Sequence, residues 1–143
     1  MDTPPTLLIV EDEILPAMAL EAGLHDAGYH VMDLTSRPQE ALDAARARKP
    51  DLALVNIKLY GRNDGVALAL DLKALGVPVL FISGQPDSAI AARAASVGSL
   101  AKPYSVEDMV AAVAYLLARL NGDATQPRPA DLEVFDEDLP EVA

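Results

Sequence analysis

The 143-residue sequence contains no cysteine, and no apolar run approaches the roughly 20 residues of a membrane-spanning helix. The missing cysteines exclude disulfides, thiol nucleophiles and thiolate metal sites, and they suit a reducing cytosol. The N-terminal residues carry neither a basic region nor an apolar stretch, so no secretory signal is expected. We therefore expect a cytoplasmic protein that does not insert into a membrane.

Basic residues are also scarce. The chain has 11 basic and 22 acidic residues, which gives a formal net charge of −11. Seven of the acidic residues but only one basic residue, Arg128, lie beyond Leu120. An acidic chain without a basic stripe is a poor candidate for nucleic-acid binding, because phosphate contacts supply most of that affinity. The expected partners are proteins or cations.

Half of the residues are apolar, and they form five alternations of a strand with a helix. The predicted strands are residues 7–10, 30–34, 52–57, 77–82 and 99–101. Near-continuous apolar runs are typical of strands that are covered on both faces, as in a parallel sheet. Consecutive strands begin roughly 22 to 25 residues apart, which leaves room for a crossover helix in each interval. The pattern predicts an α/β fold.

Helix ends carry local signals. Ser36 with Gln39 predicts a capping box for a helix over residues 38–47, and Ser105 with Asp108 predicts one for a helix over residues 106–120. Three glycines stand where a left-handed helix end is expected before the next strand: Gly28, Gly76 and Gly98.

The composition changes after Leu120. Residues 1–120 are expected to form one domain, and residues 121–143 form an acidic, proline-containing tail. In residues 131–143 acidic side chains alternate with apolar ones. We favour a disordered, solubilising tail. The alternative is an arm that docks on its own domain or on that of a partner.

Polar side chains follow four of the five predicted strands. The first strand ends in Glu11 and Asp12, the third in Asn56, the fourth in Ser83 and the fifth in Lys102. Ligands of open parallel sheets bind at the carboxyl ends of the strands. Two acids can hold Mg²⁺, a lysine can balance phosphate oxygens, and a serine can donate a hydrogen bond to one. The combination predicts a site for phosphoryl transfer by positioning and charge neutralisation.

Several segments make the chain resemble the receiver domains of bacterial two-component response regulators. The matching segments are LLIVEDE, PDLALVNIKL, the later DG (Asp64 and Gly65), PVLFISG and LAKPYS, and the resemblance covers about residues 6–120. It implies a flavodoxin-like (βα)5 fold, a doubly wound parallel sheet with strand order 2-1-3-4-5. It also implies a signalling module rather than an enzyme. Since few residues follow Leu120, we expect a stand-alone receiver without an output domain.

The resemblance assigns a role to each matching position. It implies that Asp12 ligates Mg²⁺ directly, that Glu11 acts mainly through water, and that the backbone carbonyl of Lys58 is a further ligand. Asn56 falls on the phosphoacceptor position. Ser83 and Lys102 match the residues that contact the phosphoryl group, and the Lys102–Pro103 bond matches the cis-proline of the family.

Asn56 departs from the pattern, because the family has an aspartate there. A neutral amide is a very poor nucleophile towards phosphorus, so this chain should not form an acyl phosphate at position 56. The amide should also weaken Mg²⁺ binding. Two explanations compete: an Asp→Asn substitution that silences an ordinary receiver, and a natural pseudo-receiver. We favour the substitution, because Asp12, Ser83 and Lys102 are all retained.

The resemblance also indicates the partners. A histidine kinase or a histidine phosphotransfer protein would supply the phosphoryl group, with contacts near Ile14, Leu15 and Met18. Output is expected through residues 89–95 and the last helix, and a homodimer through the last two helices or the tail is an open option. Ser99 replaces the switch aromatic of many receivers. The main alternative is a phosphorylation-independent adaptor. A phosphohydrolase is disfavoured, because the chain lacks a substrate-capping insertion.

Overall fold

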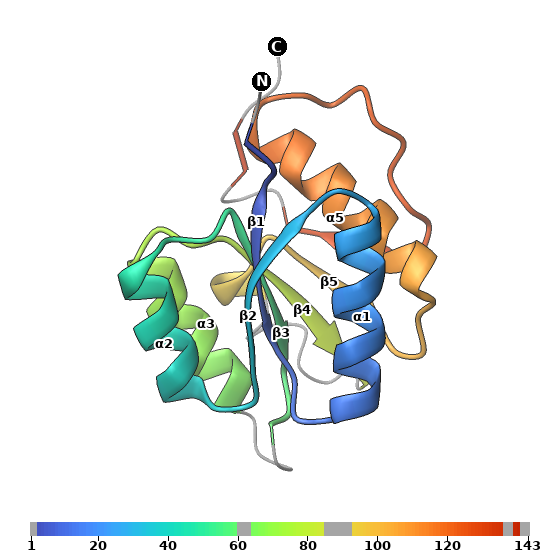
Figure 1. Ribbon diagram of the computed structural model, residues 1–143. Helices are drawn as coiled ribbons and strands as arrows, with labels where there is room; N and C mark the ends of the chain where they lie inside the picture. The colour runs from blue at the N-terminus through green and yellow to red at the C-terminus, as the bar shows by residue number, and fades with distance from the viewer. Residues whose placement is uncertain (1–2, 60–63, 85–92, 136–138, 141–143) are drawn as a thin grey trace.

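The computed structural model of the chain describes residues 3–59, 64–84, 93–135 and 139–140. A twisted sheet lies between two layers of helices (Figure 1). The elements, in chain order, are β1 (Thr6–Val10), α1 (Ile14–Asp26), β2 (His30–Thr35), α2 (Pro38–Ala47), β3 (Leu52–Asn56), α3 (Asp64–Ala74), β4 (Val79–Ser83), β5 (Gly98–Ala101), α5 (Val106–Leu120) and β6 (Leu132–Val134).

The sheet has the order β2-β1-β3-β4-β5-β6. The strands β1 to β5 are parallel, and their order is the predicted 2-1-3-4-5. The sixth strand, β6, comes from the C-terminal segment and pairs antiparallel with β5. Every residue of β1 and β3 is buried, which explains why these strands are apolar except for Thr6 at the start of β1 and Asn56 at the end of β3.

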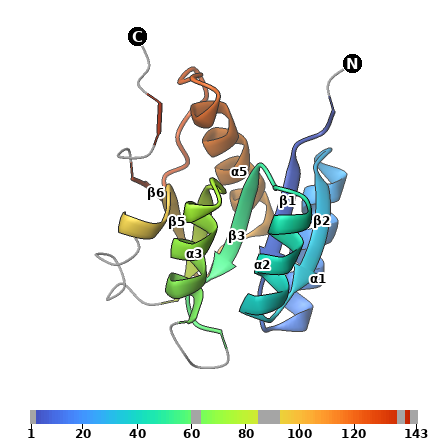
Figure 2. The ribbon, with the colours of Figure 1, turned by 90° about the vertical axis from the view of Figure 1, so that its left-hand side faces the viewer.

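The helices α1 and α5 cover one face of the sheet, and α2 and α3 cover the other (Figure 2). Leu20 of α1 and Met109 of α5 belong to the first layer of the core, and Leu72 of α3 belongs to the second. Residues 93–95 are helical and lead into β5, whereas most of the predicted output helix over residues 89–95 lies outside the described residues. No helix in the described segments is long and apolar enough to span a bilayer.

The two predicted capping boxes have different outcomes. At α5, Ser105 Oγ accepts a hydrogen bond from the Asp108 N–H at 3.0 Å, and the Asp108 carboxylate accepts one from the Ser105 N–H at 3.2 Å, so this box is confirmed. The prediction for Ser36 is wrong. The N-cap of α2 is Arg37, which has an extended backbone and caps with no side chain. The reason is Pro38, which holds the preceding residue in an extended conformation.

Two of the three predicted left-handed glycines are confirmed, since φ is +99° at Gly28 and +81° at Gly76. Gly98 does not precede β5 but is its first residue, and it has no positive φ. The prediction for Gly98 is therefore wrong.

Candidate functional site

The predicted site residues gather at the carboxyl edge of the sheet. Glu11 and Asp12 directly follow β1, Asn56 and Ser83 are the last residues of β3 and β4, and Lys102 directly follows β5. Because all four strands are parallel, their ends deliver these side chains to one edge.

Direct contacts connect the site residues. The side-chain amide of Asn56 donates a hydrogen bond to Asp12 Oδ1 at 3.2 Å. The ammonium of Lys102 lies 3.5 Å from Glu11 Oε1. The backbone N–H of Lys102 donates to the Ser83 carbonyl at 2.8 Å. These contacts link the ends of β1, β3, β4 and β5, so the structure brings together all five residues.

Glu11 is the most deeply placed charge of the site, with a side chain only 3% exposed. Its Oε2 is buried and accepts no well-formed hydrogen bond from the described residues. Burial raises the pKa of the Glu11 carboxyl, and the nearby Asp12 raises it further, while Lys102 and Asn56 act in the opposite direction. The site therefore contains buried negative charge that Lys102 compensates only in part.

The end of β3 is held from two sides. The Ile57 N–H donates to the Ile82 carbonyl at 3.0 Å, and the Gly65 N–H donates to the Ile57 carbonyl at 3.0 Å. A Cβ at Gly65 would collide with the Asn56 carbonyl oxygen and would lie 2.6 Å from the Ile57 carbonyl oxygen. Position 65 therefore requires glycine, so that α3 can begin against the strand that presents Asn56. The sequence analysis included Gly65 in the matching segment DG but gave it no role of its own.

The oxygen atoms at this edge fit a magnesium ion. Within the described part of the chain, no three acidic, histidine or cysteine side chains lie close enough together to hold a metal. Glu11 and Asp12 nevertheless supply carboxylate oxygens, Asn56 supplies an amide oxygen, and the backbone carbonyl of Lys58 follows two residues later. Mg²⁺ takes oxygen ligands and keeps several water molecules, so a site with two carboxylates suits it.

Tyr104 is a neighbour of the site that the sequence analysis missed. The Lys102–Pro103 peptide bond is cis, as the resemblance implies, and Tyr104 follows it. Burial raises the pKa of the Tyr104 hydroxyl, and the charges of Glu11 and Glu13 raise it further. The Tyr104 hydroxyl is therefore a neutral group beside the carboxylates of Glu11 and Glu13. The signal in the sequence was the position of Tyr104 two residues after Lys102.

A cavity of about 430 Å³ adjoins the site between α1 and the start of α5. Pro16 and Ala19 line it from α1, and Lys102, Tyr104 and Val106 line it from the other side. Its wall is mostly apolar. Lys102 lines the cavity and also forms the ion pair with Glu11, so the cavity lies next to the acidic side chains.

The surface of α1 is apolar around its first turns. Ile14 is 71% exposed, Leu15 is 77% exposed and Met18 is 57% exposed. Neighbouring residues of the same helix, Pro16 and Ala19, line the cavity. The helix therefore presents an exposed apolar surface beside the acidic site.

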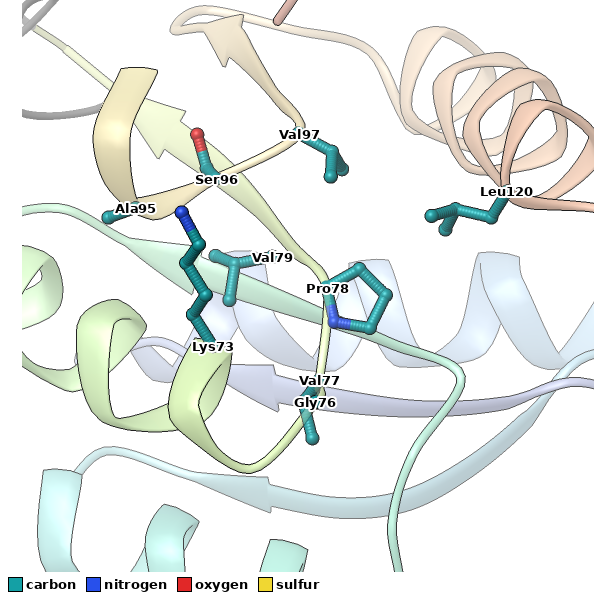
Figure 3. A pocket seen from close by; sticks show the side chains of 9 residues that line it. All are labelled: Lys73, Gly76, Val77, Pro78, Val79, Ala95, Ser96, Val97 and Leu120. Atoms are coloured by element: carbon teal, nitrogen blue, oxygen red, sulfur yellow. The ribbon is translucent and has the colours of Figure 1, made fainter. Parts of the chain in front are cut away.

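A second cavity, of about 310 Å³, lies at the opposite end of β4 and β5 (Figure 3). Val79 and Val97 line it near the starts of these strands, and Leu120 lines it from the end of α5. Its lysine, Lys73, donates a hydrogen bond to the Ala94 carbonyl at 2.8 Å. Because ligands of parallel sheets bind at the carboxyl ends of the strands, this cavity is not the candidate site.

Comparison with known families gives a direct assignment. The family described as "response regulator receiver domain" matches residues 7–114. The chain belongs to this family. Receiver domains are signalling modules of two-component systems, which interact with histidine kinases or phosphotransfer proteins and bind Mg²⁺ at an acidic pocket.

This receiver has similar relatives in several bacteria. It is 30% identical to the transcriptional regulatory protein PdtaR of Mycobacterium tuberculosis over 120 residues. The matched region covers 81% of this chain and 58% of PdtaR. The chain spans about half the length of the curated relatives it matches.

Solved structures agree with the fold. The signal receiver domain of a modulated diguanylate cyclase from Desulfovibrio desulfuricans is 36% identical, with a TM-score of 0.67 over 73% of this chain and 86% of that one. The anti-anti-sigma factor PhyR from Bartonella quintana is 26% identical, with a TM-score of 0.71 over 80% of this receiver and 49% of that chain.

Proposed function

We propose that this chain is a response regulator receiver whose phosphoacceptor position holds Asn56, and that this residue blocks phosphorylation. The observation that carries the proposal is the position of Asn56. It is the last residue of β3, only 5% exposed, with its amide on the Asp12 carboxylate. An aspartate at the same position would present a carboxylate at the edge of the sheet where β4 ends in Ser83 and Lys102 follows β5.

The chemistry of the proposal is phosphoryl transfer from a phosphohistidine to a carboxylate oxygen. A carboxylate attacks phosphorus, and an amide does not. Lys102 would balance the negative oxygens of the phosphoryl group, and the Ser83 hydroxyl would donate a hydrogen bond to one of them. Asp12, the Asn56 side chain and the Lys58 carbonyl would hold Mg²⁺, with Glu11 acting through water. The ion supplies charge neutralisation on the transferring group.

The Asn56 amide should lower the affinity for Mg²⁺, because it removes one negative charge from the ligand set. It also relieves repulsion with the Glu11 and Asp12 carboxylates, so the fold should tolerate it well. Retention of Asp12, Ser83 and Lys102 supports an Asp→Asn substitution in an otherwise ordinary receiver.

The exposed apolar surface of α1 is the proposed contact for the donor. Ile14, Leu15 and Met18 lie beside the cavity that reaches Lys102, so a protein docked there would bring its phosphohistidine to the pocket. In the Asn56→Asp background, to which the control below is also added, Leu15→Asp should slow transfer from a phosphohistidine protein without changing the reaction with a small phosphodonor. Leu70→Asp, at a position of α3 that is 48% exposed, is the matched control.

A second candidate is a pseudo-receiver that binds a partner protein without phosphate chemistry. The observation in its favour is the similarity to a relative named as an anti-anti-sigma factor. In that case Asn56 is the natural residue, and the Glu11–Lys102 ion pair serves as a structural contact.

Intact-protein mass spectrometry distinguishes the two candidates. The chain and its Asn56→Asp variant are incubated with Mg²⁺ and a small acyl phosphate, and an Asn56→Asp/Lys102→Met variant serves as the control. We expect only the Asn56→Asp variant to gain one phosphoryl group. If it gains none while remaining folded, the retained site residues do not suffice, and the adaptor becomes the better reading.

A further inference from the structure

The C-terminal arm, defined here as residues 131–135, adds a strand to the edge of the sheet (Figure 2). Its strand β6 runs antiparallel to β5, with Leu132 opposite Leu100 and Val134 opposite Gly98. The Phe135 N–H continues this pairing with a hydrogen bond to the Val97 carbonyl at 2.9 Å. The arm therefore covers the backbone groups that an edge strand would otherwise expose.

The arm is held from both faces of the sheet. Leu132 is 1% exposed and packs in the layer of α1 and α5. Phe135 is 3% exposed and packs in the opposite layer. The Arg93 guanidinium lies 5.2 Å from the centre of the Phe135 ring, which is a cation–π distance. The two faces of the sheet thus bury an apolar and an aromatic side chain of one extended segment.

Gly98 indicates that β5 is built to accept a strand at this edge. A Cβ at this position would lie 2.7 Å from the Glu133 carbonyl oxygen, which is too close. Since Gly98 has no positive φ, glycine is required there for space and not for its backbone conformation. The same Cβ would meet the side chains of Leu116 and Leu132 at ordinary distances of 3.5 and 3.6 Å.

The attachment of the arm is slight compared with that of the other strands. Residues 121–131 connect α5 to β6 without helix or strand, and nearly all of them are exposed. The arm pairs with β5 over three residues, Leu132 and Phe135 anchor it, and Leu139 is buried a few residues beyond it. Ordering such a segment costs conformational entropy, which its contacts must offset. Because β6 is the last strand of the sheet, its departure would break only its pairing with β5 and leave the pairing of β1 to β5 in place.

We propose that the edge of β5 is a strand-addition site for a partner protein, and that the arm is its intramolecular occupant. The partner would contribute an extended segment antiparallel to β5, with apolar side chains at the positions of Leu132 and Val134 and an aromatic ring at that of Phe135. Main-chain hydrogen bonds supply affinity in this mode of recognition, and the side-chain pockets supply specificity. The arm must leave before such a partner binds.

A labelled synthetic peptide of residues 129–140 is the probe, and its binding to full-length chains is measured by fluorescence anisotropy. The Leu132→Asp/Phe135→Asp variant carries a released arm and should bind the peptide. The unaltered chain should bind at least about tenfold more weakly, because its own arm competes at high effective concentration. A peptide with the same two substitutions should not bind. Adding Gly98→Ala to the released-arm variant should abolish binding.

Failure of the peptide to bind a folded released-arm variant would overturn the proposal, as would equal binding with Gly98→Ala. If the released-arm variant instead elutes as a dimer, the edge of β5 joins two copies of this chain and not a partner's segment. Hydrogen exchange on the unaltered chain provides a second test that needs no variant. The Phe135 amide should exchange at least about tenfold faster than the amides between β3 and β4. Exchange of both sets at one common rate would show that the arm is an integral strand.

Discussion

Replacement of Gly65 by alanine should disturb the site more than its size suggests. The added Cβ would collide with the Asn56 carbonyl oxygen and lie 2.6 Å from that of Ile57. Both are backbone atoms at the end of a buried strand, so neither can rotate away. Overpacking of this kind costs about 1–3 kcal/mol, and rigid neighbours favour the upper half of that range. The higher helix propensity of alanine returns about 0.5–1 kcal/mol. We expect a net loss of about 2 kcal/mol.

Equilibrium unfolding in urea measures this loss. With a slope of about 2 kcal/mol per molar urea, the midpoint should fall by about 1 M. Gly84→Ala is the matched control, because a Cβ there meets nothing within 4 Å and the residue is exposed at the same edge of the sheet. Its free energy of unfolding should change by less than about 0.5 kcal/mol. If Gly65→Ala is as mild as Gly84→Ala, the contact between α3 and β3 does not position Asn56.

Further predictions concern charge and capping. Burial raises the pKa of the Glu11 carboxyl above its ordinary value of 4.5. Below pH 4.5 the carboxyl is protonated in both the folded and the unfolded chain, so it does not oppose folding. As pH rises through the folded-state pKa, ionisation of Glu11 lowers the free energy of unfolding. Glu11→Gln should therefore stabilise the fold at pH 8, by a margin that shrinks as pH falls, as thermal unfolding across pH would show. Ser105→Ala should lower the free energy of unfolding by about 1 kcal/mol, whereas Ser105→Asp should retain most of the stabilisation from the cap. Equal urea midpoints for the two variants would contradict the role of the capping box.

The site was predictable because its geometry follows from a rule of parallel sheets. Apolar runs located the strands, and the polar residue after each run then had to lie at one edge. Asp12, Asn56 and Lys102 lie close together in the structure, although they are far apart in the sequence and no local motif links them. Roles that depend on a second element were not predictable in this way. Gly65 is needed because α3 starts against β3, and the pattern around residue 65 does not show that contact.

Local signals failed where a distant or neighbouring residue decided the structure. Ser36 is not the N-cap of α2, because Pro38 holds Arg37 in an extended conformation and the helix begins only after Arg37. Gly98 was interpreted as a helix end, yet its requirement arises from Glu133, which is 35 positions along the chain and enters through β6. The strand β6 has only three residues, one of them acidic, and it lies in an acidic segment that contains proline. Such a composition is typical of disordered segments. Only the pairing with β5 distinguishes β6 from them.

The strand β5 serves two sites that use different residues. Its continuation, Lys102, pairs with Glu11 at the acidic edge, and Gly98 and Leu100 pair with the arm. Phe135 of the arm contacts Val97 through its N–H and Arg93 through its ring, and neither of these is a residue of the acidic edge. The side chain of Asn56 contacts Asp12, and the pairing of β5 with the arm does not involve it. The proposed strand-addition site would therefore not depend on phosphorylation at position 56, and a partner could use it once the arm has left.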